Sequence, residues 1–163
     1  MPADHPEALI EETLAGPFGK LPMAGMLREH GSRFMGAALP ATYKRGMPRR
    51  CFRNAAQLTR SRHLEYWEGW AWVPSFGALP FDHAWCVDPQ SGCVVDSTWE
   101  NPADCVYLGL HVPTEVLLEA RRETGVWGVL DVRRGRMADA LKRYLSQLPL
   151  RDETLGQEMS LSA

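Results

Sequence analysis

The chain has 163 residues, with 18 basic and 20 acidic side chains and a formal net charge of -2 at pH 7. Hydrophobic residues make up 45% and charged residues 23%, which excludes intrinsic disorder and a polycation that coats nucleic acid. No segment approaches the roughly 18 apolar residues that cross a bilayer, and the N-terminus lacks an export leader, so no membrane association is expected. We expect one domain over residues 1–150 and a loose tail over residues 151–163.

Helices are predicted near the N-terminus. Pro6 lies in the first turn of a predicted helix that ends before Gly16. Apolar residues at three- and four-residue steps predict a second helix over residues 22–39. After a basic connection over residues 41–50, helix-forming residues predict a third helix, which begins at or next to Cys51.

The rest of the chain carries strand patterns followed by helix patterns. We predict strands over residues 64–73, 83–88, 93–99, 106–112 and 126–132. Turn formers over residues 89–92 join the second strand to the third. Two more helices are predicted over residues 114–123 and 136–148. This order indicates an α+β fold in which an antiparallel sheet packs against helices.

A hairpin places an imidazole beside a carboxylate. If its turn is centred between residues 90 and 91, the numbers of opposed residues sum to 181, so that His83 lies opposite Thr98 and Trp85 opposite Asp96. Side chains alternate along strands, so all four share one face of the sheet. His83 and Asp96 are then diagonal neighbours, about 7 to 8 Å apart at the backbone, and their side chains can meet.

Cys51 lies in a basic stretch at a helix start. Between residues 44 and 53 there is no acid, and the basic residues are Lys44, Arg45, Arg49, Arg50 and Arg53. Positive side chains and the helix dipole favour a thiolate, and free N–H groups at a helix start can hold an oxyanion. Any one of Cys51, His83 and Asp96 alone is more often structural, but together they predict a catalytic triad.

These residues lie in motifs that resemble the transglutaminase-like and papain-like cysteine superfamily. The motifs are CFRNA (residues 51–55), YWEGWA (66–71), DHAW (82–85) and VVDSTW (94–99). They also resemble a pattern in small uncharacterised bacterial and phage proteins. The resemblance implies a papain-like or transglutaminase-like core and acyl transfer through a thioester, without a cofactor. Cys51 would be the nucleophile, His83 the general base and then acid, and Asp96 the residue that orients His83.

The sequence departs from the superfamily's pattern in two ways. No Gln precedes Gln57, whereas papain-like peptidases usually carry an upstream Gln that stabilises the oxyanion, and the Gly-rich pattern around the nucleophile is missing. Tyr43 is a candidate second oxyanion donor, Asn54 is expected to be structural, and Trp85 is expected to wall the substrate cleft. Peptidase, deamidase, transamidase and arylamine-type acyltransferase activities all stay open, with a peptide, protein or small amide as substrate.

Two further interpretations compete with the triad. A zinc site would draw on Cys51, His83, Cys86, Cys93 and Cys105, but wide gaps separate them, whereas structural zinc sites use close pairs. We therefore predict no metal and expect free thiols in a cytoplasmic protein, with Cys86 and Cys93 packed in the core.

The other interpretation is a binding module without catalysis. Its tryptophans, which could line a groove for a peptide or sugar, are Trp67, Trp70, Trp72, Trp85 and Trp99. We expect Trp70 and Trp72 to belong to the core instead. Nucleic-acid binding is not expected, because one basic decapeptide in a net acidic chain makes no extended phosphate track.

Overall fold

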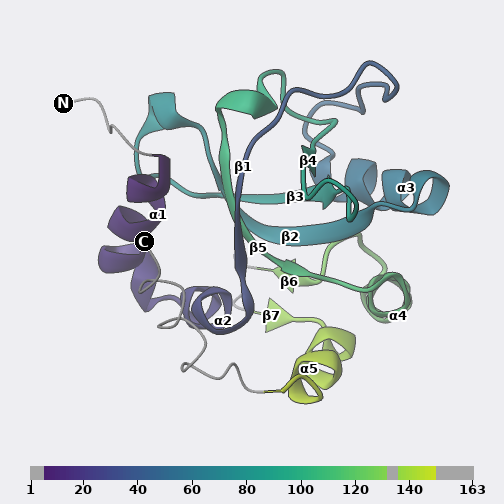
Figure 1. Cartoon of the computed structure of the whole chain (residues 1–163). Helices are drawn as coiled ribbons and strands as arrows, with labels where there is room; N and C mark the ends of the chain where they lie inside the picture. Colours follow the sequence, from purple (N-terminus) through teal and green to yellow (C-terminus); the bar gives the residue numbers. More distant parts are fainter. Residues whose placement is uncertain (1–5, 132–135, 150–163) are drawn as a thin grey trace, which may run out of the picture.

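The structure is a computed structural model that describes residues 6–131 and 136–149, and it shows the predicted α+β fold (Figure 1). The helices are α1 (Pro6–Ala15), α2 (Pro22–His30), α3 (Cys51–Arg62), α4 (Thr114–Thr124) and α5 (Asp139–Ser146). The strands are β1 (Ser32–Met35), β2 (Glu65–Trp72), β3 (Phe81–Val87), β4 (Val94–Val95), β5 (Val106–His111), β6 (Leu130–Asp131) and β7 (Arg136–Met137). Within the described residues no helix is both long and apolar enough to span a membrane. The predicted tail over residues 151–163 lies outside them.

Five strands form one antiparallel sheet in the order β1-β5-β2-β3-β4, and β6 and β7 form a separate pair. The main sheet is strongly curled. In Figure 1, β2 and β3 run roughly horizontally, whereas β1 and β5 run from top to bottom. The helix α3 packs against β2 and β3, whereas α1 and α2 contact β5. The curled sheet therefore presents two faces with different coverings.

The two faces bury different kinds of side chain. All five α-helices contribute apolar residues to the core on one face, and from β2 this core receives Tyr66, Trp70 and Trp72. The opposite face carries a smaller aromatic cluster that includes Trp85 and Tyr107. Residues alternate between the faces along each strand, as pleating requires. Trp70 and Trp72 are core residues, as predicted, with relative exposures of 1% and 0%.

A glycine on β5 makes room for the aromatic cluster. A Cβ at Gly109 would lie 2.5 Å from Cη2 of Trp85, which is closer than a side chain can approach. The indole of Trp85 thus lies directly over the backbone of β5. Any larger residue at position 109 would displace this ring.

The predicted helix over residues 22–39 was wrong in its second half. The helix ends at His30, and Ser32–Met35 form the strand β1, which pairs with β5. Phe34 packs edge-on against Trp67, with ring centroids 4.7 Å apart. The apolar spacing was compatible with one long helix, but pairing with β5 and burial of Phe34 favour a strand.

Two predicted strands are shorter than expected. The strand over residues 93–99 is reduced to Val94–Val95, because the Asp96 carboxylate accepts hydrogen bonds from the next backbone N–H groups and turns the chain away. Of the strand predicted over residues 126–132, the structure shows Leu130–Asp131 as strand, and residue 132 lies outside the described residues.

The last predicted helix starts later than expected. Its first two residues, Arg136 and Met137, instead pair with β6, and α5 begins at Asp139. Pairing with a neighbouring strand has again overridden a local helical pattern.

Candidate active site

The helix α3 begins at Cys51, as predicted. Its N-cap residue is Arg50, which supplies no side-chain cap, and the first turn holds no acidic residue. The first helical hydrogen bond runs from the Asn54 N–H to the Arg50 carbonyl, at 2.8 Å, so the N–H groups of residues 51–53 have no acceptor within the helix. Cys51 therefore lies among free backbone donors, with 9% of its surface exposed.

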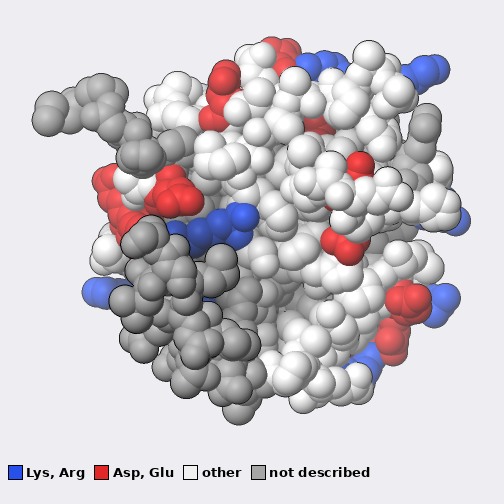
Figure 2. Space-filling view, viewed as in Figure 1, with Lys and Arg blue, Asp and Glu red and all other residues white. Residues whose placement is uncertain are grey.

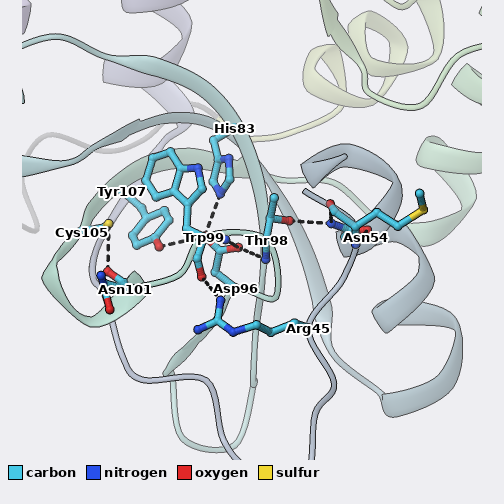
Figure 3. Close-up of polar contacts among 10 residues, drawn as sticks. Arg45, Asn54, His83, Asp96, Thr98, Trp99, Asn101, Cys105 and Tyr107 are labelled. Atoms are coloured by element: carbon cyan, nitrogen blue, oxygen red, sulfur yellow. Dashed lines mark hydrogen bonds and ion pairs between the residues drawn. The ribbon is translucent and has the colours of Figure 1, made fainter. Parts of the chain in front are cut away.

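Asn54, one turn into α3, binds two loops to the helix. Its side-chain amide donates to the Met47 carbonyl at 2.8 Å and to the Thr98 hydroxyl at 2.9 Å, and its oxygen accepts from the Met47 N–H (Figure 3). Gly46 lies so close that a Cβ there would be 2.3 Å from Cγ of Asn54. Its N–H donates to the Ser97 carbonyl at 2.9 Å. These contacts confirm a structural role for Asn54 and hold the segment after β4 against the start of α3.

The hairpin register agrees with the sequence prediction. Cys86 pairs with Val95 and Val87 with Val94, so the residue numbers of each pair sum to 181. Nε2 of His83 and Oδ2 of Asp96 are 2.7 Å apart, and both residues are almost fully buried. The predicted contact between this imidazole and this carboxylate is confirmed.

Asp96 has further hydrogen-bond donors. Its Oδ1 accepts from the Thr98 N–H at 2.9 Å, and its Oδ2 accepts from the Tyr107 hydroxyl at 3.0 Å (Figure 3). Burial alone would raise the pKa of Asp96, but the hydrogen bond and charge of His83 and these two donors lower it below its usual range. Asp96 is thus an anion at neutral pH. Tyr107 was missed by the sequence analysis, because β5 is distant from the hairpin in the chain.

Cys51 is the other side chain that acts on the His83 ring. Burial would lower the pKa of His83, yet the hydrogen bonds and charges of Asp96 and Cys51 raise it to about 9. Because Nε2 is taken by Asp96, Nδ1 is the ring nitrogen left for the thiol. The structure therefore brings Cys51, His83 and Asp96 together. The raised pKa means that the imidazole of His83 is in its positively charged form at neutral pH.

Aromatic rings enclose His83. The ring of Trp99 stacks on it with centroids 4.1 Å apart, and Trp85 lies nearly parallel at 6.4 Å. Trp99 is partly exposed and forms the outer cover, while Arg45 donates to its carbonyl at 2.7 Å. Trp85 has a relative exposure of 1%, so it supports the histidine from behind. A contact between Trp85 and a substrate, as expected from the sequence, would require this aromatic cluster to open.

Tyr43 lies in the connection that precedes α3. It is partly buried and packs against the core on the helix-covered face of the sheet. Its backbone N–H donates to the Pro40 carbonyl at 3.0 Å, which closes a turn. The structure thus places Tyr43 in a packing position on the chain leading to Cys51.

Of the other three cysteines, Cys86 and Cys105 are buried near Asp96, and burial together with the charge of Asp96 raises the pKa of both thiols. Cys86 is buried and donates to the Ala55 carbonyl at 3.2 Å. Cys105 is also buried. Cys93 is exposed in the turn before β4, so its predicted core position was wrong, because the strand starts one residue later. Among residues 6–131 and 136–149, no three His, Cys, Asp or Glu side chains are grouped to hold a metal ion.

A second buried carboxylate belongs to Glu68 of β2, which the sequence analysis did not single out. Its oxygens accept from the Tyr66 hydroxyl at 2.8 Å, from the Val129 N–H at 2.9 Å and from the Leu130 N–H at 2.8 Å. Burial is the main reason that the pKa of Glu68 is raised to about 7; the three donors oppose the rise and the charge of Asp82 adds to it. The sequence signal that could have identified Glu68 is its position as a charged residue in a predicted strand rich in aromatic residues.

Comparisons with models of protein families, with curated proteins and with solved structures find no match. The geometry of the site is therefore the basis for a functional assignment.

Proposed function

We propose that the protein is a cysteine-dependent acyl-transfer enzyme that acts on amides or peptides by hydrolysis, deamidation or transamidation. The observation that carries this proposal is the buried His83–Asp96 contact of 2.7 Å with Cys51 as the second neighbour of the histidine. A protonated imidazole is the charge complement of a thiolate. The resemblance to the transglutaminase-like and papain-like superfamily supports the same chemistry.

In the proposed reaction, the Cys51 thiolate, whose proton has passed to His83, attacks the substrate carbonyl carbon. A C–S bond forms as the π electron pair of the carbonyl moves to its oxygen. The C–N bond then breaks as His83 gives its proton to the leaving nitrogen, and a thioester remains on Cys51. Water or an amine next attacks the thioester and transfers a proton to His83 while the C–S bond breaks. Asp96 holds the ring in place and stabilises its protonated form throughout.

The oxyanion of each tetrahedral intermediate needs hydrogen-bond donors. The backbone N–H groups of residues 51–53 at the uncapped start of α3 are suited to this, because the helix dipole adds positive potential there. The Asn54 amide is already engaged by Met47 and Thr98. The backbone of α3 is therefore the proposed oxyanion site.

The competing interpretation, a binding module, needs tryptophans that line an exposed groove. Trp70, Trp72 and Trp85 are each at most 1% exposed, so they cannot contact a ligand directly. Trp67 and Trp99 remain partly exposed and pack against the aromatic cluster that includes Trp85 and Tyr107. The stacking of Trp85 and Trp99 on His83 therefore favours the enzymatic proposal over a binding module.

The proposal is tested by the reactivity of the Cys51 thiol. In a Cys93→Ser background, which removes the exposed thiol, we expect iodoacetamide at about pH 7 to alkylate Cys51 well before Cys86 and Cys105. Burial raises the pKa of both other thiols, that of Cys105 to about 12. Peptide mapping by mass spectrometry measures the rates.

Replacement of His83 by Ala should slow this alkylation at least tenfold, because the positive charge that stabilises the thiolate is lost. A matched control is His63→Ala, an exposed histidine at the other end of α3. Equal rates for all three thiols, or no effect of His83→Ala, would contradict the proposal. A panel of glutamine, peptide and thioester donors, with and without amine acceptors, then separates hydrolysis from transfer.

A further inference from the structure

A groove lined by arginines lies along the outer face of α3. It has a volume of about 650 Å³, within the range of roughly 300 to 1,000 Å³ typical of ligand sites. Its walls come from the start and outer face of α3, from the end of α4 and from the segment after α4. Its basic residues are Arg49, Arg50, Arg53, Arg60 and Arg121.

The charge in this groove is not balanced. Among the described residues, no acidic side chain lines it, and none of its five arginines forms an ion pair with an Asp or Glu side chain. On the face shown in Figure 2, by contrast, acidic and basic side chains are interspersed with uncharged surface. Five guanidinium groups around one hollow repel each other unless an anion lies between them, and guanidinium groups pair with carboxylates in a bidentate manner.

The spread of the arginines favours an extended ligand over a compact one. Arg50 and Arg60 are ten residues apart along α3, which corresponds to about 15 Å of helix. About five residues of extended polypeptide cover this length. A single compact anion would contact only one end of the row.

The aromatic residues that line the groove also favour a polypeptide as the extended ligand. The Arg121 guanidinium lies over the ring of Trp127, 5.1 Å from its centroid, so this face of the indole is already covered and is not open for stacking of a planar base. Phe52 and Val126 supply apolar surface between the charges. Such a groove suits side chains with apolar stems and charged ends, as Glu has.

Two chain neighbours of the candidate nucleophile line the groove, whereas Cys51 itself does not. Arg50 and Phe52, the chain neighbours of Cys51, both line it, while Arg53, Gln57 and Arg60 recur on one face of α3. A chain that lies along these residues therefore reaches the first turn of α3, where the proposed oxyanion donors are.

We propose that the substrate is an acidic polypeptide, whose Asp and Glu side chains bind the arginine groove while a nearby amide reaches Cys51. This inference rests on the proposed function for the step at Cys51, but the binding does not depend on the thiol. Its test therefore uses the full chain with Cys51→Ala, in which no acyl transfer consumes the probe.

The experiment measures fluorescence anisotropy with a labelled Glu-rich peptide of about nine residues and a Gln-rich peptide of the same length. We expect the Glu-rich peptide to bind at least tenfold more tightly, and less tightly as salt is added, because salt screens the charges. Equal binding of the two peptides would overturn the inference.

Matched variants localise the binding. Arg53→Gln with Arg60→Gln removes two charges from the groove, whereas Arg122→Gln with Lys20→Gln removes two exposed charges outside it. We expect a loss of at least tenfold for the first pair and less than twofold for the second, with thermal unfolding as a check on folding and Arg60→Gln alone as a milder variant. Equal losses, or inorganic triphosphate binding as tightly as the Glu-rich peptide, would overturn the inference.

The two experiments distinguish an error in the proposed peptide binding from an error in the proposed active site. Binding of the Glu-rich peptide to the Cys51→Ala protein reports only on the arginines, whereas alkylation of Cys51 reports only on the thiol and His83. A protein that binds the peptide and lacks a reactive thiol refutes the enzymatic proposal and retains the groove.

Discussion

Asp96 and Glu68 are both about 1% exposed and both accept several hydrogen bonds, yet their pKa values move in opposite directions. The pKa of Asp96 falls below its usual range, while that of Glu68 rises to about 7. Burial raises the pKa of each carboxylic acid, so burial does not explain the difference.

The difference lies in the partner. Asp96 faces His83, whose proton supplies a positive charge at 2.7 Å. The described hydrogen-bond donors to Glu68 are all neutral, namely the hydroxyl of Tyr66 and the N–H groups of Val129 and Leu130, and the negative charge of Asp82 adds to the rise. A paired cation therefore keeps one buried carboxylate ionised, and hydrogen bonds alone leave the other half-protonated near neutral pH.

The largest expected effect follows from removing the anion of the pair. We expect Asp96→Asn to fold, because the amide oxygen can still accept hydrogen bonds, and to lose activity by orders of magnitude. The pKa of His83 should fall from about 9, since burial is then no longer opposed by the charge of Asp96. Turnover of the substrate found in the donor panel and the pH dependence of Cys51 alkylation measure these effects.

The exposed Asp139 provides the control for this change, as Asp139→Asn. Wild-type turnover by Asp96→Asn would exclude the orienting role of Asp96. An unchanged pKa of His83 would refute the idea that the carboxylate holds its proton in place.

Next in size are the effects of pH on stability. The pKa of His83 is raised in the folded state, so its contribution is fully present below about pH 6.5 and is lost as the pH rises through about 9. One pKa unit corresponds to about 1.4 kcal/mol, which makes this contribution about 3 kcal/mol. Urea unfolding from pH 5 to 10 measures it, and a flat free energy of unfolding from pH 6.5 to 9 would contradict it.

The raised pKa of Glu68 predicts a change in folding stability over a different range of pH. The pKa of Glu68 is also raised, so its contribution is present below about pH 4.5 and is lost as the pH rises through about 7. In Glu68→Gln the amide oxygen can accept from Val129 and Leu130 while its nitrogen donates to Tyr66. We expect this variant to fold and to lose the fall in stability between pH 4.5 and 7.

A matched control for Glu68→Gln is Glu65→Gln, a partly exposed glutamate on the same strand, which should retain the wild-type profile. If Glu68→Gln retained the fall between pH 4.5 and 7, another group would be responsible for it.

The smallest expected effects come from deleting one neutral donor on each side of the comparison. Tyr107→Phe removes a hydroxyl from Asp96, and Tyr66→Phe removes one from Glu68. Each should lower the free energy of unfolding by about 1 kcal/mol and raise the pKa of the carboxylic acid that loses its donor. Tyr107→Phe should reduce activity less than tenfold; a loss as large as that of Asp96→Asn would show that the charge of Asp96 is not the deciding feature.

Contacts within one hairpin or one helix end were the most predictable. The turn formers between β3 and β4 set the register that joins His83 to Asp96, and helix-forming residues after a basic loop indicated where α3 begins. Both predictions rest on neighbours in the chain, whose geometry follows from turn type and helix propensity.

Contacts between distant segments were not predictable in the same way. The sequence predicts a helix where β1 lies, and it does not reveal the Tyr107 and Glu68 interactions, because each depends on a partner more than ten residues away. The arginine groove is similar. Its basic decapeptide is visible in the sequence, but the contribution of Arg121 and Trp127 arises only when α4 lies near α3.

Local sequence determined the chemical groups of this protein, the face of the hairpin that carries His83 and the helix start that carries Cys51. Tertiary structure decided that these two meet, that Tyr107 adds a donor to Asp96, and that five arginines surround one groove. The physical reason is that periodicity and turn chemistry act between neighbours, whereas the choice between packed partners depends on burial summed over the whole chain.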